Sequence, residues 1–190
     1  MTVMSNEKQR IREGVIFFVL FCLTIPAANW MIGHVGTMCL RDGPCVVPVA
    51  PGVMAPSGVL MVGAALVLRD LVQRRLGALF GVGAIVIGAL ISAGLAPPAL
   101  VLASASAFLL SELVDFVVYT PLARRRLVTA VMASSLVGLV VDSIVFLYLA
   151  FGSLAFLPGQ VIGKLWMVLI ALPFVAYLRR RDERLGLKAA

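Results

Sequence analysis

The stretch FLLSELVDFVVY, residues 108–119, is an apolar helical segment that carries two carboxylates, Glu112 and Asp115, one helical turn apart. The rest of the chain is equally apolar: 62% of its 190 residues are hydrophobic, 13% are charged, and the mean hydropathy is +1.07. A soluble domain of this size needs far more charged surface. About six apolar runs of roughly 18 residues or more predict transmembrane helices. The stretch therefore lies in an integral membrane protein.

The expected membrane segments are separated by short connections. Their approximate bounds are 14–36, 56–76, 78–95, 99–122, 127–152 and 159–178. The connection from 39 to 55 is rich in Pro and Gly and is predicted as a loop. The chain divides into a cytoplasmic N-terminal segment (1–13), a six-helix transmembrane domain (14–178) and a basic cytoplasmic tail (179–190). We expect no cleavable signal peptide, because no small-residue cleavage site follows the first apolar run.

Basic residues are distributed unevenly over the connections. The N-terminal segment, the second-to-third connection, the fourth-to-fifth connection and the C-terminal tail are strongly basic. The alternating connections contain only Arg41, which lies beside Asp42. The positive-inside rule therefore predicts that both termini are cytoplasmic. The same distribution accounts for the net charge of +7 and argues against nucleic-acid binding.

Three further features bear on packing and on metal binding. Small residues repeat at three- or four-residue spacing along the third segment, which predicts close helix packing. They are Gly77, Gly81, Ala84, Gly88 and Ser92. Cys39 and Cys45 lie in the first outer connection, where a disulfide and two free thiols both fit the sequence. The single histidine, His34, has no Cys or carboxylate set nearby, so we expect no metal site.

Ionisable side chains lie well inside the expected segments, where each costs about 2.5–3.5 kcal/mol on insertion scales. They are Glu112, Asp115, Asp142 and Lys164. Such residues either pair for structure or mark a substrate or ion path. At about 1.5 Å per residue, Asp142 and Lys164 lie at matching heights and can form an ion pair. Glu112 and Asp115 lie nearer the cytoplasm, where Arg69 is a candidate partner of Asp115.

Helical spacing brings polar and aromatic side chains onto shared faces. The sets are Ser104, Phe108, Ser111, Asp115 and Tyr119 with Glu112 at the edge; Ser135, Gly138, Asp142 and Phe146; Gln160 and Lys164; and Asn29 and Trp30. Together they predict a small central cavity. Carboxylates would accept hydrogen bonds there and aromatic rings would stack, so the cavity suits a planar, nitrogen-rich ring.

Three motifs resemble successive signatures of the vitamin uptake transporter family, also known as queuosine-precursor transporters. They are SASAFLLSELVDFVVY (104–119), SSLVGLVVDSIVFLYLAFG (134–152) and GQVIGKLWMVLIALP (159–173). The resemblance covers about residues 56–178. It implies an all-α bundle of six transmembrane helices in the bacterial inner membrane, similar to the substrate-binding subunits of energy-coupling-factor transporters. It also implies import of 7-deazaguanine bases, such as 7-cyano-7-deazaguanine and its aminomethyl relative.

The resemblance further implies a set of substrate-binding residues. They are Asp70, Ser111, Glu112, Asp115, Asp142, Gln160 and Lys164, with Asn29 as a less secure match. Helical spacing adds Ser135 and Phe146 to this set. The chain departs from the family pattern at Arg74, where an acidic residue is common, and at Ser134-Ser135, where Ser-Asn is common. These departures leave the exact substrate open.

The resemblance thus suggests a substrate-binding role for the two carboxylates of the stretch 108–119. We expect Glu112, Asp115 or both to accept hydrogen bonds from the guanine-like edge of a deazapurine. Asp142 and Lys164 would either hold the helices in register or contact the other edge of the base. Replacing Glu112 by Gln should then weaken binding without preventing insertion.

Several alternatives stay open. The chain can be the binding subunit of an ATP-driven transporter, or the importer of another vitamin-like heterocycle; proton coupling, passive entry with trapping, and a purely structural role also fit. An enzyme is not expected, because the sequence has no HExxH, GxSxG or phosphate loop and no His within the membrane core. We expect no catalytic residue, metal or cofactor. The expected partners are a nucleobase-like small molecule and the lipid bilayer, with a homodimer left open.

Overall fold

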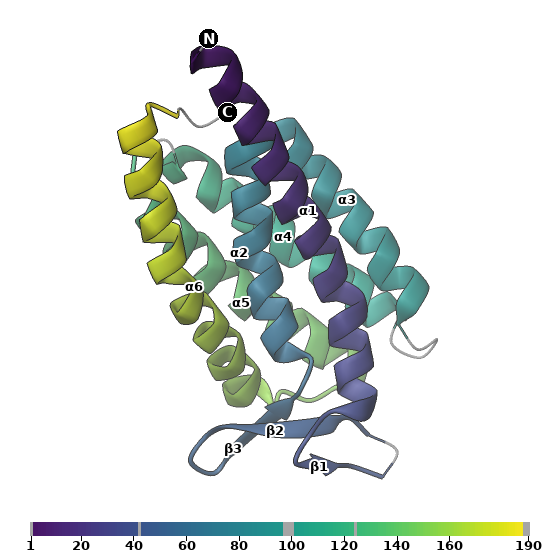
Figure 1. Cartoon of the computed structure of the whole chain (residues 1–190). Coiled ribbons are helices and arrows are strands. Elements are labelled where there is room, and N and C mark those ends of the chain that lie inside the picture. Colours follow the sequence, from purple (N-terminus) through teal and green to yellow (C-terminus); the bar gives the residue numbers. More distant parts are fainter. Residues whose placement is uncertain (1, 42, 97–100, 124, 188–190) are drawn as a thin grey trace.

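A computed structural model describes residues 2–41, 43–96, 101–123 and 125–187. Within these ranges the chain forms six helices packed as one bundle and a small sheet at one end (Figure 1). The helices are α1 (Thr2–His34), α2 (Val59–Leu76), α3 (Ala78–Leu95), α4 (Val101–Ala123), α5 (Leu127–Phe151) and α6 (Leu157–Leu185). The start of α1 and the end of α6 lie at the same end of the bundle, here called the termini end, and the sheet lies at the opposite end.

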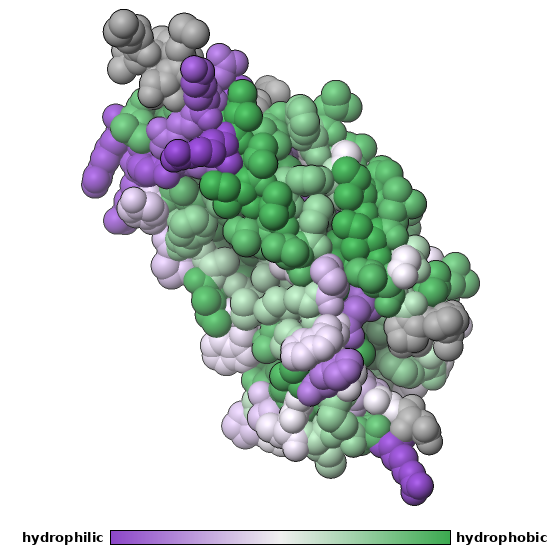
Figure 2. Space-filling model, turned by 45° about the vertical axis from the view of Figure 1, so that its right-hand side comes forward, coloured by the Kyte–Doolittle hydropathy of each residue, from purple (hydrophilic) through white to green (hydrophobic). Residues whose placement is uncertain are grey.

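Five of the described helices are long and apolar enough to cross a membrane: α1 from Glu7 onward, and α3, α4, α5 and α6. At about 1.5 Å per residue, such helices match a hydrocarbon core of about 30 Å. Their large apolar side chains, among them Leu79, Leu102 and Ile170, are exposed on the outside of the bundle. Figure 2 shows a face that is largely hydrophobic, with hydrophilic side chains gathered at the termini end. The protein is a multi-pass membrane bundle.

Helix α2 is the exception among the six expected spans. It carries Arg69, Asp70, Arg74 and Arg75, and it is not among the helices apolar enough to span by composition. Its side chains are instead mostly buried, because α2 packs against α1, α3, α5 and α6. A helix surrounded by other helices does not need an apolar surface for lipid, and it can carry charges where partners are supplied.

The bounds of the predicted segments agree closely with the helices, and glycine explains two of the sharp ends. Gly77 separates α2 from α3 with φ of 98°, a conformation that side chains disfavour, and this permits the abrupt reversal between the two helices. Gly152 ends α5 in the left-handed conformation at φ of 61°. The first and last helices are longer than predicted, since α1 begins at Thr2 and α6 continues to Leu185.

The connection from 39 to 55, predicted as a loop, folds instead into most of a three-stranded antiparallel sheet. Its strands are β1 (Met38–Cys39), β2 (Cys45–Ala50) and β3 (Val53–Pro56), in the order β1-β2-β3. A disulfide joins Cys39 to Cys45. The indole Nε1 of Trp166 on α6 donates to the carbonyl of Val49 at 2.9 Å, which ties the sheet to the bundle. The Pro and Gly residues favoured a loop, although β2 buries Cys45, Val46 and Val49.

The main core lies between the helices and is built from side chains of all six. Phe21 of α1 packs against Phe108 of α4, with ring centroids 6.0 Å apart, over Gly88 of α3. A Cβ at Gly88 would lie 2.5 Å from the Phe108 ring, so the small residue is required for this contact. The stripe of small residues predicted on the third segment is therefore a packing face over most of its length.

Candidate functional site

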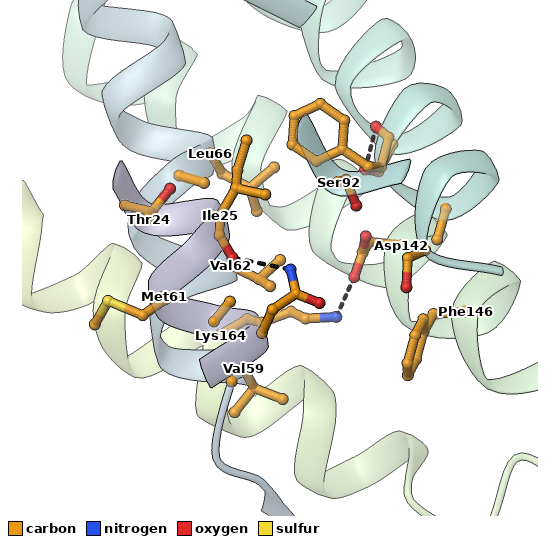
Figure 3. Close-up of a pocket in the computed structure, with 18 of the residues that line it drawn as sticks. Thr24, Ile25, Val59, Met61, Val62, Leu66, Ser92, Asp142, Phe146 and Lys164 are labelled. Carbon is orange, nitrogen blue, oxygen red and sulfur yellow. Dashed lines mark hydrogen bonds and ion pairs between the residues drawn. The ribbon is translucent and has the colours of Figure 1, made fainter. Parts of the chain in front are cut away.

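A cavity lies in the half of the bundle nearer the sheet, and all six helices contribute to its lining (Figure 3). Of the ten residues predicted to bind a substrate, the ones that line it are Asn29, Ser111, Glu112, Asp142, Phe146, Gln160 and Lys164. These seven residues are far apart in the sequence, on α1, α4, α5 and α6, and they lie together around one cavity. Among the described residues the remaining lining is largely apolar, with Thr24, Ser92 and Ser104 adding hydroxyl groups.

The cavity has a volume of about 90 Å³. A single water needs about 10–15 Å³ of such a cavity, so there is room for several waters or for the small heterocycle that displaces them. In Figure 3 the Lys164 side chain extends across the cavity floor to Asp142, and the Phe146 ring stands beside that pair. Predominantly apolar walls with a few convergent polar groups are typical of small-molecule sites.

Lys164 is the centre of the polar group on the cavity wall. Its Nζ donates to the Asp142 carboxylate at 2.5 Å, to Ser143 Oγ at 2.8 Å and to Gln160 Oε1 at 2.7 Å. The ammonium group is 1% exposed, and its three donors have three acceptors. The ion pair predicted between Asp142 and Lys164 is confirmed, and it joins α5 to α6.

Glu112 also lines the cavity, and its carboxylate is held in place by Arg69 of α2, which does not line it. Arg69 Nε donates to Glu112 Oε2 at 2.8 Å. The same guanidinium also donates to Asp115, as predicted, and lies 3.0 Å from Asp70 through Nη1. A ligand that reaches Glu112 therefore meets a carboxylate whose position is fixed by a buried cation outside the cavity.

Arg69, Asp70, Glu112 and Asp115 form what we call the buried acid cluster. Each of the four residues is at most 1% exposed. Ser134 Oγ of α5 donates to Asp70 Oδ2 at 3.0 Å, so the cluster joins α2, α4 and α5. Arg69 was predicted as a partner of Asp115 and also binds Glu112, because the several N–H donors of a guanidinium can serve more than one carboxylate.

Asp70, Asp115 and Ser135 were expected at the ligand, but none of them lines the cavity. The helical rise explains two of these positions. Asp70 lies four residues beyond Leu66, and Asp115 three residues beyond Glu112, so each sits about one turn deeper toward the termini end than a lining residue. Ser135 is fully buried in α5. These residues support the cavity from behind and do not face it.

Other placements also differ from the sequence-based expectation. Ser92, the last member of the small-residue stripe, lines the cavity, and Thr24 does so from α1. Neither was recognised from the sequence as a cavity residue, because a lone hydroxyl in an apolar helix usually donates to a carbonyl of its own helix. Thr24 does so to the Phe21 carbonyl at 2.6 Å. Trp30 was expected to offer an aromatic face to the cavity, but it is 57% exposed and stacks on His34.

A third polar layer closes the termini end, where α1, α2 and α6 meet. Arg75 donates two hydrogen bonds to the Asp182 carboxylate, at 2.8 and 2.9 Å, and its Nε lies 2.9 Å from Glu13. Arg74 donates to the same Asp182 at 2.9 Å, and Arg181 donates to Glu13 at 2.6 Å. Arg74, noted as a departure from the family pattern, is thus part of this termini-end network.

The polar groups of the bundle therefore form three layers along its axis: the cavity, the buried acid cluster and the termini-end network. Helix α2 contributes to all three, through Val62, Arg69 and Arg75. The cavity layer offers a carboxylate, an amide, an ammonium–carboxylate pair and the rings of Phe108 and Phe146. Within the described residues no group of His, Cys, Asp and Glu is suited to hold a metal ion.

A multi-pass membrane bundle with a buried polar cavity of this kind has the architecture of a membrane protein that handles a small molecule. Residues 93–178 match the family model described as "Putative vitamin uptake transporter". The match spans the end of α3, the whole of α4 and α5 as described, and α6 as far as residue 178, and it includes the motifs on which the resemblance was based. Over these residues the chain is similar to the vitamin uptake transporter family.

No curated protein matches the chain, and neither does any solved structure. The likeness of its helix arrangement to energy-coupling-factor substrate-binding subunits therefore stays a prediction.

Proposed function

We propose that the protein imports a queuosine precursor, 7-cyano-7-deazaguanine or 7-aminomethyl-7-deazaguanine, or a closely related nucleobase. The observation that carries the proposal is the composition of the cavity wall, which combines the Glu112 carboxylate with Gln160 and the Asp142–Lys164 pair. A guanine-like base has adjacent ring N–H and amino donors on one edge. A carboxylate accepts both at once.

The apolar part of the cavity supports the same class of ligand. Phe108 of α4 and Phe146 of α5 line it, together with Ile25 and Leu66. Aromatic side chains at such a site stack on or pack against the faces of a planar ring. An aliphatic lipid would gain nothing from the buried carboxylate, and its burial would leave the polar groups without partners.

The proposal includes a location and an orientation. We place the protein in the bacterial cytoplasmic membrane with both termini inside, because the basic connections follow that pattern. Helix α2 is then the sixth span, shielded from lipid by its neighbours. The sheet lies at the outer side, close to the cavity, and the termini-end network lies at the cytoplasmic side.

The test is thermal unfolding of the purified full-length protein with a panel of deazaguanines, guanine, adenine and several vitamins. A ligand that binds only the folded state raises the melting temperature by mass action. We expect stabilisation by a 7-deazaguanine and not by guanine. Stabilisation by another vitamin-like heterocycle alone would retain the transporter class and reject the deazaguanine. No stabilisation by any compound of the panel would contradict the proposed substrate class.

Uptake by the isolated chain in liposomes then separates transport from binding alone. Accumulation of the stabilising ligand inside the liposomes supports an autonomous importer. Binding without uptake would identify the chain as the binding subunit of an ATP-driven transporter.

A further inference from the structure

The buried acid cluster contains more acid than base. The single guanidinium of Arg69 faces three carboxyl groups, those of Asp70, Glu112 and Asp115, and each residue is at most 1% exposed. With all three carboxyls ionised, the cluster would carry two uncompensated negative charges in the membrane interior. Buried charges without partners are so costly that such groups bind a proton instead.

The neighbouring charges in the described part of the chain do not restore the balance. On the cavity side, Asp142 of α5 and Lys164 of α6 cancel each other. On the termini side, Arg74 of α2 is engaged by Asp182 of α6. Helices α1 and α3 contribute apolar side chains such as Phe21 and Ala84 to the core, and the Cys22 side chain packs against it. These side chains carry no charge.

The geometry indicates where the missing proton resides. The carboxyl groups of Asp70 and Asp115 contact the same guanidinium, that of Arg69, and are therefore close neighbours. Oδ1 of Asp70 and Oδ2 of Asp115 are buried and accept no hydrogen bond from the described residues, although Asp70 Oδ1 lies 3.0 Å from Nη1 of Arg69. Two carboxylates repel each other, whereas an acid and a carboxylate share a hydrogen bond.

A second, independent polar group lies at the same place. Tyr119, one turn beyond Asp115 on α4, is fully buried, and its hydroxyl has no partner among the described residues. Its ring lies against the Arg69 guanidinium, 5.9 Å from centroid to carbon. A buried phenol that can both donate and accept is suited to pass a proton to or from a carboxyl group. Beyond it, Gln73 donates to Thr120 at 2.9 Å on the side of the termini.

We propose that Asp70 and Asp115 form a proton-binding site, and that Arg69 couples this site to the ligand at Glu112. The coupling, but not the proton site itself, rests on the proposed function. A base that donates hydrogen bonds to Glu112 requires its carboxylate form. Arg69 then neutralises Glu112, and the Asp70–Asp115 pair retains its proton. When the base leaves, water in the cavity solvates the Glu112 carboxylate in place of the guanidinium. Arg69 then neutralises Asp115, and the pair releases its proton to that water. The proton therefore moves with the substrate.

The proton site is tested without any ligand, by infrared titration of the full-length protein in liposomes. At neutral pH the carbonyl stretch of a buried protonated carboxyl group is expected. It should be lost or shifted in Asp70→Asn and in Asp115→Asn, and kept in Glu112→Gln and in the exposed control Glu183→Gln. Absence of the band at neutral pH, or its loss only in Glu112→Gln, would overturn the proposal.

The coupling is tested in the same liposomes by uptake of 7-cyano-7-deazaguanine with and without an imposed pH gradient, alkaline inside. The gradient should stimulate uptake by the unmodified protein several-fold. Uptake by Asp115→Asn should be the same with and without the gradient. Uptake that ignores the gradient would refute the coupling. Absence of uptake under every gradient would reject the proposed function instead, and the infrared titration would still decide whether the proton site exists.

Discussion

Arg69 and Glu112 connect the interior of the bundle to its cavity: Nε of Arg69 on α2 donates to Oε2 of Glu112 on α4 at 2.8 Å. Glu112 lines the cavity, whereas Arg69 is fully buried behind it. The carboxylate is thus presented to a ligand by a cation that the ligand does not touch. The consequences of this arrangement can be measured, as can those of the other polar layers.

Replacing Glu112 by Gln should weaken ligand binding while the protein still inserts and purifies. Gln keeps the size of the side chain but loses the charge that strengthens hydrogen bonds from a base. Loss of a charge-assisted hydrogen bond costs about 1.5–3 kcal/mol, or roughly 10- to 100-fold in affinity. Thermal shift with a 7-deazaguanine measures the change. Glu183→Gln, the same substitution at an exposed position of α6, is the matched control and should bind normally. Unchanged binding by Glu112→Gln would exclude its role.

The Asp142–Lys164 pair should respond differently to single and to double substitution. Asp142→Asn or Lys164→Met alone leaves one buried charge without a partner, which costs about 3–5 kcal/mol. The double variant removes both charges and should recover most of the stability. Thermal unfolding of the three variants measures this coupling.

The same double variant decides between the two roles expected for this pair. If the pair contacts the base, the double variant is stable but no longer stabilised by the ligand. If the pair only holds α5 against α6, the double variant binds as the unmodified protein does.

Gly63→Ala should destabilise the protein and disturb the cavity. A Cβ at this position of α2 would lie 2.6 Å from the Lys164 carbonyl oxygen and 2.9 Å from its Cα, so α2 and α6 must separate. Overpacking of this kind costs about 1–3 kcal/mol. Gly83→Ala on α3 is the control, because a Cβ there meets nothing within 4 Å. Equal melting temperatures for the two variants would contradict the close helix contact.

Asp182→Asn should lower stability more than the exposed substitution Glu183→Gln. Asp182 accepts two hydrogen bonds from Arg75, which is 1% exposed, and two from Arg74 at 2.9 and 3.2 Å. Removal of the charge leaves the Arg75 guanidinium poorly compensated, with an expected cost of about 3–5 kcal/mol. Thermal unfolding at low and high salt is the measurement. A loss of stability no greater than that of Glu183→Gln would show that the termini-end network contributes little.

The orientation predicts which cysteines can be labelled from outside the cell. After reduction of its disulfide with Cys45, the exposed Cys39 should react with a membrane-impermeant maleimide in intact cells. A cysteine introduced by Glu183→Cys, at the termini end of α6, should react only after the membrane is opened. Substitution of the native Cys22 removes its background. Labelling of Glu183→Cys in intact cells would reverse the proposed topology.

The sequence predicted the membrane segments well, because hydrophobic length is a local property. The helix α3 occupies the predicted bounds 78–95. The motifs around Glu112, Asp142 and Lys164 led to the family resemblance, which the match to residues 93–178 confirms over that range. Charged residues inside apolar segments could also be recognised from the sequence, because their position within one segment is again a local property. The pairing of Asp142 with Lys164 also followed from the sequence, because their heights along neighbouring helices can be counted from residue numbers.

The arrangement around the bundle axis was decided only by the tertiary structure. Helical spacing put Asp115 on the same face as Ser111, but one further turn of rise moved it out of the cavity and into the cluster with Arg69. The sheet of residues 38–56 and the central position of α2 also depend on partners remote in the chain. Hydrophobic length and charge are properties of single segments, whereas the partner of a buried charge is fixed by how helices rotate and pack against one another.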